Sequence, residues 1–486
     1  MSTETLMASV RELLDAAEPV LGERANRIAP LRDRLDGPLR VAIAGKVKAG
    51  KSTLLNALVG ERVAPTDAGE RTRIVTRYRN SHVYRVTAVP WAGEPVELRF
   101  RRTERDLDFT LEGHRADDIH YVDVEWPAGR LRDLELIDTP GLASVSDDVS
   151  RRTRRFLGAD EDGPGGADAV VYLMRHLHPT DVSFLEAFRD NIATLGASVN
   201  AIGVLSRADE IGSARPNAMV AAERIAARYR ADPRINGLCQ VVIPVAGLIA
   251  EGATTLRQDE ADALRAIALL DVPAPADLLV SVQRFTTLPA PPGLEPDVRA
   301  RLLDRFGLFG VRLAVELIGD GRVNSAAELA DALELTSGIH ELRHVLRGHF
   351  ASRAAVLKAR STLATVWALA DQHGGPDGRR LRERIRDIEL AAHELVEIRL
   401  LSQLRRGAIE LGPAEPEARR ILGDDGADPT IRLGLTDVAA PDEVRSAAID
   451  TIARWRITAQ DPLLGRAARE LVEGVVRSCE ALAAPT

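Results

Sequence analysis

Three of the four lysines in this chain of 486 residues lie within six positions, at Lys46, Lys48 and Lys51, whereas the other sixty cationic side chains are arginine. The segment from Gly45 to Ser52 fits the pattern G-x-x-x-x-G-K-[ST], in which backbone N–H groups wrap phosphates, the lysine reaches the β and γ oxygens and the serine holds Mg²⁺. Arginine at position 51 would place a bulky fork where a compact charge is needed. The predicted nucleotide contacts here are Gly45, Lys46, Lys48, Ala49, Gly50, Lys51, Ser52 and Thr53.

A second cluster follows the apolar run 134–137, where the chain reads Asp138-Thr139-Pro140-Gly141. An aspartate at a strand end can hold the water shell of Mg²⁺, and a glycine lets its backbone N–H approach the γ-phosphate because no Cβ stands in the way. Asp-x-Pro-Gly also forms ordinary turns. Behind an apolar strand and downstream of a phosphate loop, however, it predicts that Asp138 shares the metal with Ser52 and that Gly141 takes part in catalysis.

Between these two clusters a threonine must reach the metal and the γ-phosphate. The segment 65–76 offers three candidates, and we rank Thr72 first, Thr76 second and Thr66 third. Each of them taken singly also fits a solvated loop or strand threonine. We assign the metal and catalytic role to Thr72.

The base-reading residues are expected after the apolar run 201–205, at Ser206-Arg207-Ala208-Asp209. This resembles the guanine-reading N/T-K-x-D element, whose carboxylate accepts two N–H groups that adenine does not offer. Charge-assisted hydrogen bonds of this kind are worth roughly 1.5–3 kcal/mol. Ser206 and Arg207 depart from the pattern, although an arginine can lie flat over a purine. The predicted ligands are therefore GTP and GDP, with base contacts from Ser206, Arg207, Asp209, Ala246 and Gly247.

The elements around these residues have the order that the chemistry requires. Residues 39–44 predict a buried strand, and residues 53–59 have the apolar spacing of a helix that ends at Gly60. Strand, loop and helix in this order place a helix N-terminus at the phosphates. The continuous apolar run 169–174 predicts a central strand buried on both faces.

The whole pattern resembles the bacterial dynamin-like GTPase superfamily. The resemblance is carried by residues 44–54, 64–68, 74–76, 206–212 and 303–310, and it extends over most of the chain. It implies Mg²⁺-dependent GTP hydrolysis coupled to self-association and to membrane remodelling or maintenance. The implied partners are a second copy joined through the nucleotide domain, or a related dynamin-like protein, and an anionic membrane surface. In the dynamin pattern the switch threonine lies seven residues beyond a proline, which fits Pro65 and Thr72.

Lys48 departs from animal dynamins, which have a serine at this position. In those proteins the serine and a monovalent cation help to neutralise charge in the transition state. Lys48 is therefore a candidate catalytic cation, in cis or across a dimer, although a lysine pointing at solvent fits the sequence equally well. Leu142 and Ala143 follow Gly141 where a Ras-type glutamine would stand, so Thr72 and backbone groups are expected to position the attacking water.

The predicted fold class is an α/β P-loop GTPase domain with an elongated all-α helical bundle. We expect an N-terminal bundle helix at 1–36, the GTPase domain at 37–285, a proline-rich hinge at 286–296 and the helical stalk at 297–486. Helical spacing within 5–36 is interrupted near Pro19. Residues 339–372 predict one helix of about 50 Å, and residues 381–411 predict its antiparallel partner.

The turn between these two helices is followed by a run of arginines. Basic side chains beside an aromatic ring suit anionic lipid headgroups, with roughly 1 kcal/mol per cation near such a surface. A solvated helix start fits the same pattern, because acidic residues interleave. The candidate lipid contacts, within a possible tip at 373–386, are Trp367, Arg379, Arg380 and Arg382.

Composition sets wider limits. The net charge of −8, with both signs mixed along the chain, argues against a nucleic-acid partner. No apolar run approaches the length of a membrane span, so we expect a cytoplasmic protein that contacts the inner face of the plasma membrane peripherally. The two cysteines, Cys239 and Cys479, indicate no disulfide framework.

Two other function classes stay open. A regulatory GTPase of another kind would need a basic, RNA-binding C-terminal module, which the acidic-leaning helical half does not resemble. A weakly hydrolysing GTP-binding scaffold that assists a related dynamin-like protein is consistent with the departures at Ser206 and Arg207.

Overall fold

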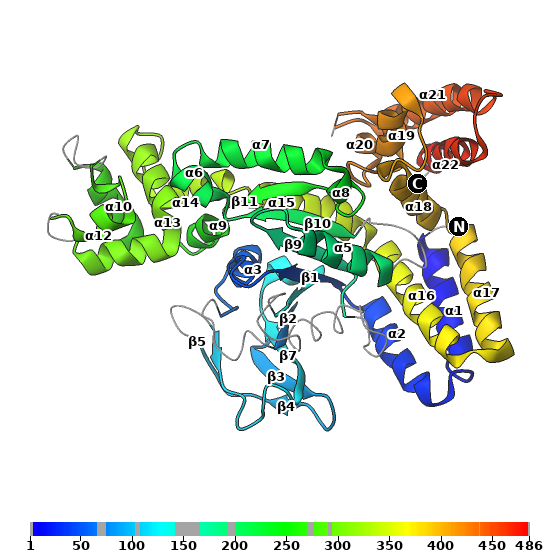
Figure 1. Ribbon diagram of the computed structural model, residues 1–486, viewed down its shortest axis with the longest axis horizontal. Helices are drawn as coiled ribbons and strands as arrows, with labels where there is room; N and C mark the ends of the chain where they lie inside the picture. Colours follow the sequence, from blue (N-terminus) through cyan, green and yellow to red (C-terminus); the bar gives the residue numbers. More distant parts are fainter. Residues whose placement is uncertain are drawn as a thin grey trace.

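The computed structural model describes residues 3–65, 74–102, 107–140, 166–191, 200–270, 277–289, 294–436 and 438–484. Figure 1 shows a sheet in the middle of an elongated molecule, with helices at both ends. This confirms the predicted fold class, an α/β domain joined to an extended helical region.

The central sheet has the strand order β11-β10-β9-β1-β8-β2-β7-β3-β4. Its strands β8, β1, β9, β10 and β11 run parallel, as expected for short apolar strands that are covered on both faces. β2 runs antiparallel to β8, and a further antiparallel pairing joins β3 to β7. The bounds are β1 (Leu39–Gly45), β2 (Val75–Asn80), β3 (Arg85–Pro90), β4 (Val96–Glu97), β7 (Ile119–Trp126), β8 (Leu134–Asp138), β9 (Ala169–Met174), β10 (Ala201–Ser206) and β11 (Val242–Val245), with a separate pair β5 (Phe100–Arg102) and β6 (Leu107–Phe109).

Helices cover both faces of the parallel strands. One face packs against α3 (Lys51–Val59), α9 (Gly247–Thr254) and α15 (Ile339–Val345). The other face packs against α5 (Pro179–Asn191), α7 (Ala218–Ala231) and α8 (Pro233–Asn236). Because the carboxyl ends of parallel strands share one edge, the loops after β1, β8, β10 and β11 meet there, which is where open α/β sheets bind ligands.

A helical body lies beyond β11, at the left of Figure 1. One apolar cluster there joins α9 to α10 (Gln258–Ala268), α12 (Val282–Thr287), α13 (Pro296–Gly319) and α14 (Ala326–Thr336). The first helices after the predicted hinge therefore share a core with helices that precede it. The domain bounds given above stay predictions.

A second helical body lies at the other end of the molecule and contains the N-terminal helices. One apolar cluster joins α1 (Thr3–Ala17) and α2 (Ile28–Asp36) to α16 (Ala354–His373) and α17 (Gly375–Ala391). The interruption expected near Pro19 is present, because α1 ends at Ala17 and a 3₁₀ segment, η1 (Gly22–Arg27), precedes α2. The antiparallel pair is α16 and α17, joined at Gly374 with φ 68°.

The prediction of one straight helix over 339–372 is wrong. A π-helical segment, η6 (Leu346–Phe350), and a 3₁₀ segment, η7 (Ala351–Arg353), separate α15 from α16. The packing partners change at this point, because Phe350 is buried against the sheet core whereas α16 packs with α1. The partner predicted over 381–411 is also broken, at Ala392 (φ −82°, ψ 107°), between α17 and α18 (His393–Arg405).

The remaining helices form a C-terminal cluster around α18. They are α19 (Glu415–Ile421), α20 (Pro429–Leu433), α21 (Pro441–Ala459) and α22 (Arg466–Ala483). Short helical segments elsewhere are η3 (Gly129–Leu131), η5 (Ala208–Glu210), α6 (Ile211–Ala214) and η8 (Gly412–Ala414).

One buried carboxylate fastens the N-terminal body to the sheet. Asp168, just before β9, has no exposed surface and accepts hydrogen bonds from Arg34 of α2 (2.7 Å) and Ser361 of α16 (2.6 Å). It also accepts from the backbone N–H of Arg40 in β1 (3.0 Å). The segment before β9 is thereby tied to α2, to β1 and to the distant α16, at the edge of the sheet opposite the loops that carry the site.

Candidate functional site

The phosphate loop has the geometry that its glycines allow. Gly45 ends β1 with φ 149°, and a Cβ there would lie 2.6 Å from the carbonyl oxygen of Leu173 in β9. Gly50, with φ 93°, forms the left-handed residue before the first turn of α3. Residues other than glycine rarely adopt either of these backbone conformations. The loop thus brings the N-terminus of α3 to the carboxyl edge of the sheet, where a helix favours phosphate.

Lys51, the first residue of α3, folds back over this loop. Its Nζ lies 3.4 Å from the Gly45 carbonyl oxygen and 3.3 Å from that of Lys46. Burial lowers the pKa of the Lys51 ammonium, and the carboxylate of Asp138 opposes that shift. Carbonyl oxygens are modest acceptors for an ammonium, so phosphate oxygens would be stronger partners at the same place.

Ser52 and Asp138 meet as predicted for a metal site. The Ser52 hydroxyl donates to Asp138 Oδ2 at 2.9 Å. Oδ1 of the same carboxylate is buried and accepts no hydrogen bond from the described residues. Burial raises the pKa of Asp138, while Lys51 and the Ser52 hydroxyl lower it. A hydroxyl beside a carboxylate with a free oxygen is a hard oxygen donor set, which fits Mg²⁺.

Lys46 has a partner that the sequence did not reveal. Its Nζ lies 3.3 Å from Asp181, near the start of α5, whose side chain is 1% exposed. The Asp181 carboxylate also accepts from the Tyr172 hydroxyl (2.7 Å) and the His178 backbone N–H (3.0 Å). Asp181 therefore anchors the first turn of the phosphate loop to β9 and α5. An aspartate early in a helix is too common a signal to have predicted this contact.

Lys48 differs from the other two lysines of the loop. It adopts φ 62°, which is uncommon for a residue with a side chain, and it is exposed at the rim of the site. Val47 beside it is 47% exposed. The loop therefore turns these two side chains toward solvent.

The switch residues are only partly covered by the structure. Thr66, Thr72 and Gly141 lie outside the described residues. Thr76 is described: it is buried in β2 and pairs in register with Asp138 of β8. The assignment of Thr72 to the metal and of Gly141 to catalysis stays a prediction.

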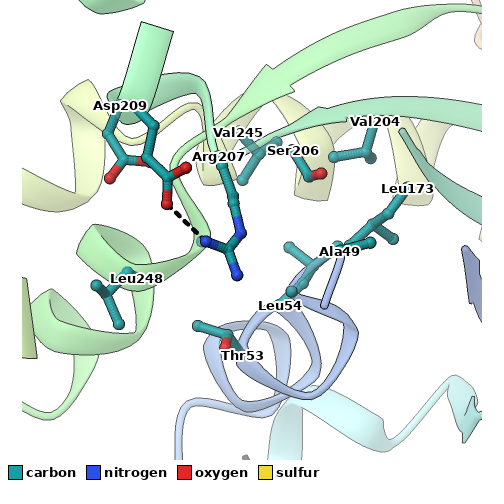
Figure 2. A pocket seen from close by; sticks show the side chains of 13 residues that line it. Ala49, Thr53, Leu54, Leu173, Val204, Ser206, Arg207, Asp209, Val245 and Leu248 are labelled. Atoms are coloured by element: carbon teal, nitrogen blue, oxygen red, sulfur yellow. Dashed lines mark hydrogen bonds and ion pairs between the residues drawn. The ribbon is translucent and has the colours of Figure 1, made fainter. Parts of the chain in front are cut away.

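A cavity opens beside the phosphate loop (Figure 2). Its walls come from the loop and α3, from β9 and β10, from the segment after β10, and from the start of α9. The lining residues are Ala49, Gly50, Thr53, Leu54, Leu173, Val204, Ser206, Arg207, Asp209, Glu210, Val245, Gly247 and Leu248. Apolar walls with a few polar groups at one end suit a purine.

Asp209 is the buried acid of this cavity. It is 6% exposed, and burial raises the pKa of its carboxyl to about 6, with Glu210 adding to the shift and Arg207 opposing it. A buried carboxylate at a cavity wall favours a ligand that brings N–H donors. Asp209 therefore lines the cavity, and its role in reading the base stays a prediction.

The structure also shows the contacts of Ser206 and Arg207, the two residues that depart from the guanine-reading pattern. Ser206 donates to the Met174 carbonyl oxygen at 3.3 Å. Arg207 has φ 53° and its side chain extends toward Thr53 and Leu54 (Figure 2), while its guanidinium donates to Glu210 at 2.7 Å. Arg175 pairs with the same carboxylate at 2.8 Å. The guanidinium is thus held at the cavity by Glu210, a residue that the sequence did not single out.

Ala246 and Gly247 close the other side. Gly247 lines the cavity, and a Cβ there would lie 3.8 Å from the backbone nitrogen of Leu54. Ala246 is buried behind the cavity, and its backbone N–H donates to Ser337 (2.9 Å). The apolar wall residues Leu173, Val204 and Leu248 went unnoticed in the sequence because apolar strand residues carry no specific signal.

The four candidate lipid contacts lie far from this site, at α16 and α17. Arg382 pairs with Asp371 and stands over the Trp367 ring, 5.8 Å from its centroid. Arg379 and Arg380 are exposed at the start of α17, and Arg380 lies 3.4 Å from Asp377. The structure thus separates a half-buried pair, Trp367 and Arg382, from an exposed pair, Arg379 and Arg380.

Comparisons with known proteins agree with this geometry. Residues 41–188 match the model of the Dynamin family. The chain is 39% identical over 452 residues to the isoniazid-induced protein IniC of Mycobacterium tuberculosis, which covers 93% of this chain and 91% of that protein. It is 30% identical over 156 residues to the bacterial dynamin-like protein of Nostoc punctiforme, which covers 29% of this chain and 21% of that protein.

Among solved structures, one of an oligomerised bacterial dynamin pair aligns with 99% of this chain and 75% of that chain, at a TM-score of 0.36 and 13% identity. Within the described residues, no helix is both long and apolar enough to cross a bilayer.

Proposed function

This chain belongs to the bacterial dynamin-like GTPase family, and we propose that it binds GTP with Mg²⁺ and hydrolyses it to GDP and phosphate. The observation that carries the proposal is one continuous cavity that runs from Gly50 of the phosphate loop to the buried carboxylate of Asp209. Such a cavity fits a guanine at one end and phosphates at the other. In the reaction, water attacks the γ-phosphorus, the bond to the β–γ bridging oxygen breaks, and GDP leaves.

The residues of the phosphate loop would act by position and charge. The Lys51 ammonium would leave its two carbonyl partners for the β and γ oxygens, where it offsets developing negative charge. Ser52 and Asp138 would hold the Mg²⁺, which neutralises phosphate charge when bound. Thr72 would orient the attacking water, and the backbone of Gly141 would approach the γ-phosphate.

The base would be chosen at Asp209. Its carboxylate accepts the two N–H groups on the guanine edge, whereas adenine presents a bare ring nitrogen there. Arg207, held by Glu210, lies where it can cover the purine face.

Lys48 is proposed as the cation that replaces a monovalent ion at the transition state. Its exposure at the rim allows the ammonium to serve its own nucleotide or that of a second copy that packs across the nucleotide face. Dimerisation through the nucleotide domain would then raise a slow basal turnover. A related dynamin-like protein is the other proposed partner.

We place the membrane contact at the turn between α16 and α17. The chain would be cytoplasmic and would bind peripherally to the inner face of the plasma membrane. Arg379 and Arg380 are exposed there, and cations near an anionic surface contribute about 1 kcal/mol each. Arg382 and Trp367 are engaged with each other, so they would support the turn.

A weakly hydrolysing GTP-binding scaffold is the second candidate. It is favoured by the departures at Ser206 and Arg207, since the Arg207 guanidinium is bound to Glu210.

One assay separates the two candidates. GTP turnover is measured against protein concentration, with and without anionic vesicles, for the native chain and Lys51→Ala. Turnover that rises with concentration and with vesicles, and is lost in Lys51→Ala, supports the GTPase. Flat, negligible turnover of a native chain that still binds GDP supports the scaffold.

A further inference from the structure

Helix α13 contains a break that lies against the base-reading carboxylate. Gly307 interrupts the helix with φ 64° and ψ 173°, a combination that is essentially restricted to glycine. A Cβ on Gly307 would lie 3.5 Å from Asp209 Oδ2 and 3.6 Å from Leu248 Cδ2. Gly307 therefore lies within the reach of one methyl group of two residues that line the cavity, although it belongs to a helix outside the nucleotide-binding loops.

The break is held in place by its neighbours on both sides. Arg305 Nε donates to Glu260 (2.7 Å), and its NH2 group donates to the Thr255 carbonyl oxygen (2.8 Å). Phe306 is fully buried against Gly252 of α9, where a Cβ would lie 2.7 Å from its ring. These contacts explain the segment 303–310, which the sequence singled out without assigning it a role: it docks α13 on α9.

The loop that carries Asp209 is itself strained. Arg207 has φ 53°, and Gly212, Ser213 and Ala214 follow with φ 64°, 65° and 56°. Left-handed conformations are unfavourable for residues with a side chain, and they persist only where the surroundings impose them. A contact from outside the loop must therefore hold this shape.

Arg312 supplies that contact, less than two helical turns after the break. Its NH1 group donates to the Ala214 carbonyl oxygen (2.5 Å). Its Nε and NH2 groups donate to the Leu279 carbonyl oxygen (2.8 and 2.6 Å), and NH2 also donates to that of Val280 (3.0 Å). One guanidinium thus ties the end of the strained loop to the segment that precedes α12.

We propose that the segment of α13 from Gly307 to Arg312 is a clamp that positions Asp209 for guanine. Gly307 supplies the backbone conformation that breaks the helix beside the carboxylate, and Arg312 fixes the far end of the loop at Ala214. Both are positioning residues, since they act through Asp209. The inference rests on the proposed function, because it concerns selectivity at the same site.

The clamp predicts a loss of base discrimination without a loss of phosphate binding. In Arg312→Ala the loop 207–214 is free to relax, so the carboxylate no longer faces the guanine edge. We expect GDP affinity to fall about tenfold while ADP affinity, which depends on the phosphate loop, changes less than about twofold. Fluorescent GDP and ADP titrations measure both constants.

Matched variants make the result specific. Arg322→Ala removes an exposed arginine that pairs with Glu316 and Asp320 at the end of the same helix, and it should leave the GDP/ADP ratio unchanged. Gly307→Ala should lower the ratio as Arg312→Ala does. Gly319→Ala, where a Cβ meets nothing within 4 Å, should not.

Combination with Asp209→Asn tests the route of the effect. If Arg312 acts through the carboxylate, Arg312→Ala should not lower the GDP/ADP ratio further in an Asp209→Asn background. If Arg312→Ala does not fold by thermal melting, Arg312→Lys, which keeps the charge but not both sets of hydrogen bonds, is used in its place.

Two outcomes would overturn the clamp: equal losses of GDP and ADP affinity in a folded variant, or an unchanged ratio. A native chain without preference for GDP over ADP would instead refute the proposed function.

Discussion

The two ends of the nucleotide cavity are built in different ways. At the phosphate end, one continuous stretch from Gly45 to Ser52 supplies the contacts, and its shape follows from two glycines in left-handed or near-extended conformations. At the base end, Asp209 is set by a strained loop, by α9 and by the break in α13. If the proposed function holds, local geometry determines phosphate binding, whereas packing between distant segments determines base choice.

This difference implies that a substitution can impair the function of one end of the cavity without impairing that of the other. A substitution in the phosphate loop should abolish binding of any nucleotide, while one at the base end should change only which nucleotide is preferred.

The largest effect is expected for Lys51→Ala. Removal of the ammonium leaves the phosphate charge unopposed at the loop, so we expect GTP turnover to fall at least a hundredfold. Lys51→Arg should fail as well, because the guanidinium fork does not fit the place of a point charge. Turnover at saturating protein measures both, with thermal melting as the control for folding. Turnover within twofold of the native chain in either folded variant would argue against a phosphate role for Lys51.

Asp209→Asn is expected to change the base preference while leaving the phosphate end intact. An amide donates where the carboxylate accepted, so it matches the carbonyl of xanthine better than the N–H groups of guanine. We expect the preference for guanosine over xanthosine diphosphate to shift about tenfold or more. Competition titrations of the two nucleotides measure the shift. An unchanged preference would remove Asp209 from the base site.

The pH dependence concerns the same carboxyl. With its pKa raised to about 6, Asp209 is mostly ionised at pH 7 and mostly protonated at pH 5 in the free chain. Guanine requires the ionised form, so binding must expel a proton at the lower pH, and affinity falls as pH decreases through 6. The charged neighbours are Glu210 and Arg207, while α13 and α9 present the uncharged Gly307 and Leu248.

We therefore expect the ratio of GDP to ADP affinity to fall about tenfold from pH 7 to pH 5. The ratio is the useful quantity, because the titration of the diphosphate is common to both ligands. A flat ratio over this range would mean that the carboxyl is ionised throughout or does not contact the base.

Lys48 sits at the phosphate end but outside the loop's enclosed part. If its ammonium acts as the transition-state cation, Lys48→Ala should lower turnover about tenfold and make it depend on potassium, which the native chain should not require. Turnover in potassium and in sodium buffers measures this. A strong potassium requirement of the native chain would contradict the role.

The smallest effect is expected at the α16–α17 turn, far from the cavity. Arg379→Ala alone should weaken binding to anionic vesicles by about 1 kcal/mol, roughly fivefold, and leave nucleotide binding unchanged. Vesicle co-sedimentation measures this, with Arg322→Ala as the control for an exposed arginine elsewhere. Equal loss in the control would show that the turn has no special part in membrane contact.

The difference between local geometry at the phosphate end and distant packing at the base end also determined what the sequence could predict. The phosphate loop, Asp138 and Asp209 could be proposed from the sequence because strand, loop and helix follow one another in the chain. Glu210, Asp181 and the contacts of Gly307 and Arg312 were missed, because each depends on segments that meet only in the folded chain.

The helical region shows the same limit. The spacing of apolar residues predicted the antiparallel pair α16 and α17, but it did not predict the break over 346–353. Before the break the helix packs on the sheet, and after it α16 packs with the N-terminal helices. The periodicity of apolar residues indicates that a side chain is buried, but it does not indicate which element buries it.

The central claim is that one cavity grips a guanine nucleotide at both ends. Isothermal titration calorimetry of the folded chain with GDP, ADP and inorganic pyrophosphate, each with Mg²⁺, tests it directly. The account predicts one GDP per chain, with heat also for pyrophosphate and a weaker affinity for ADP. No heat for GDP from a chain that melts cooperatively would contradict it.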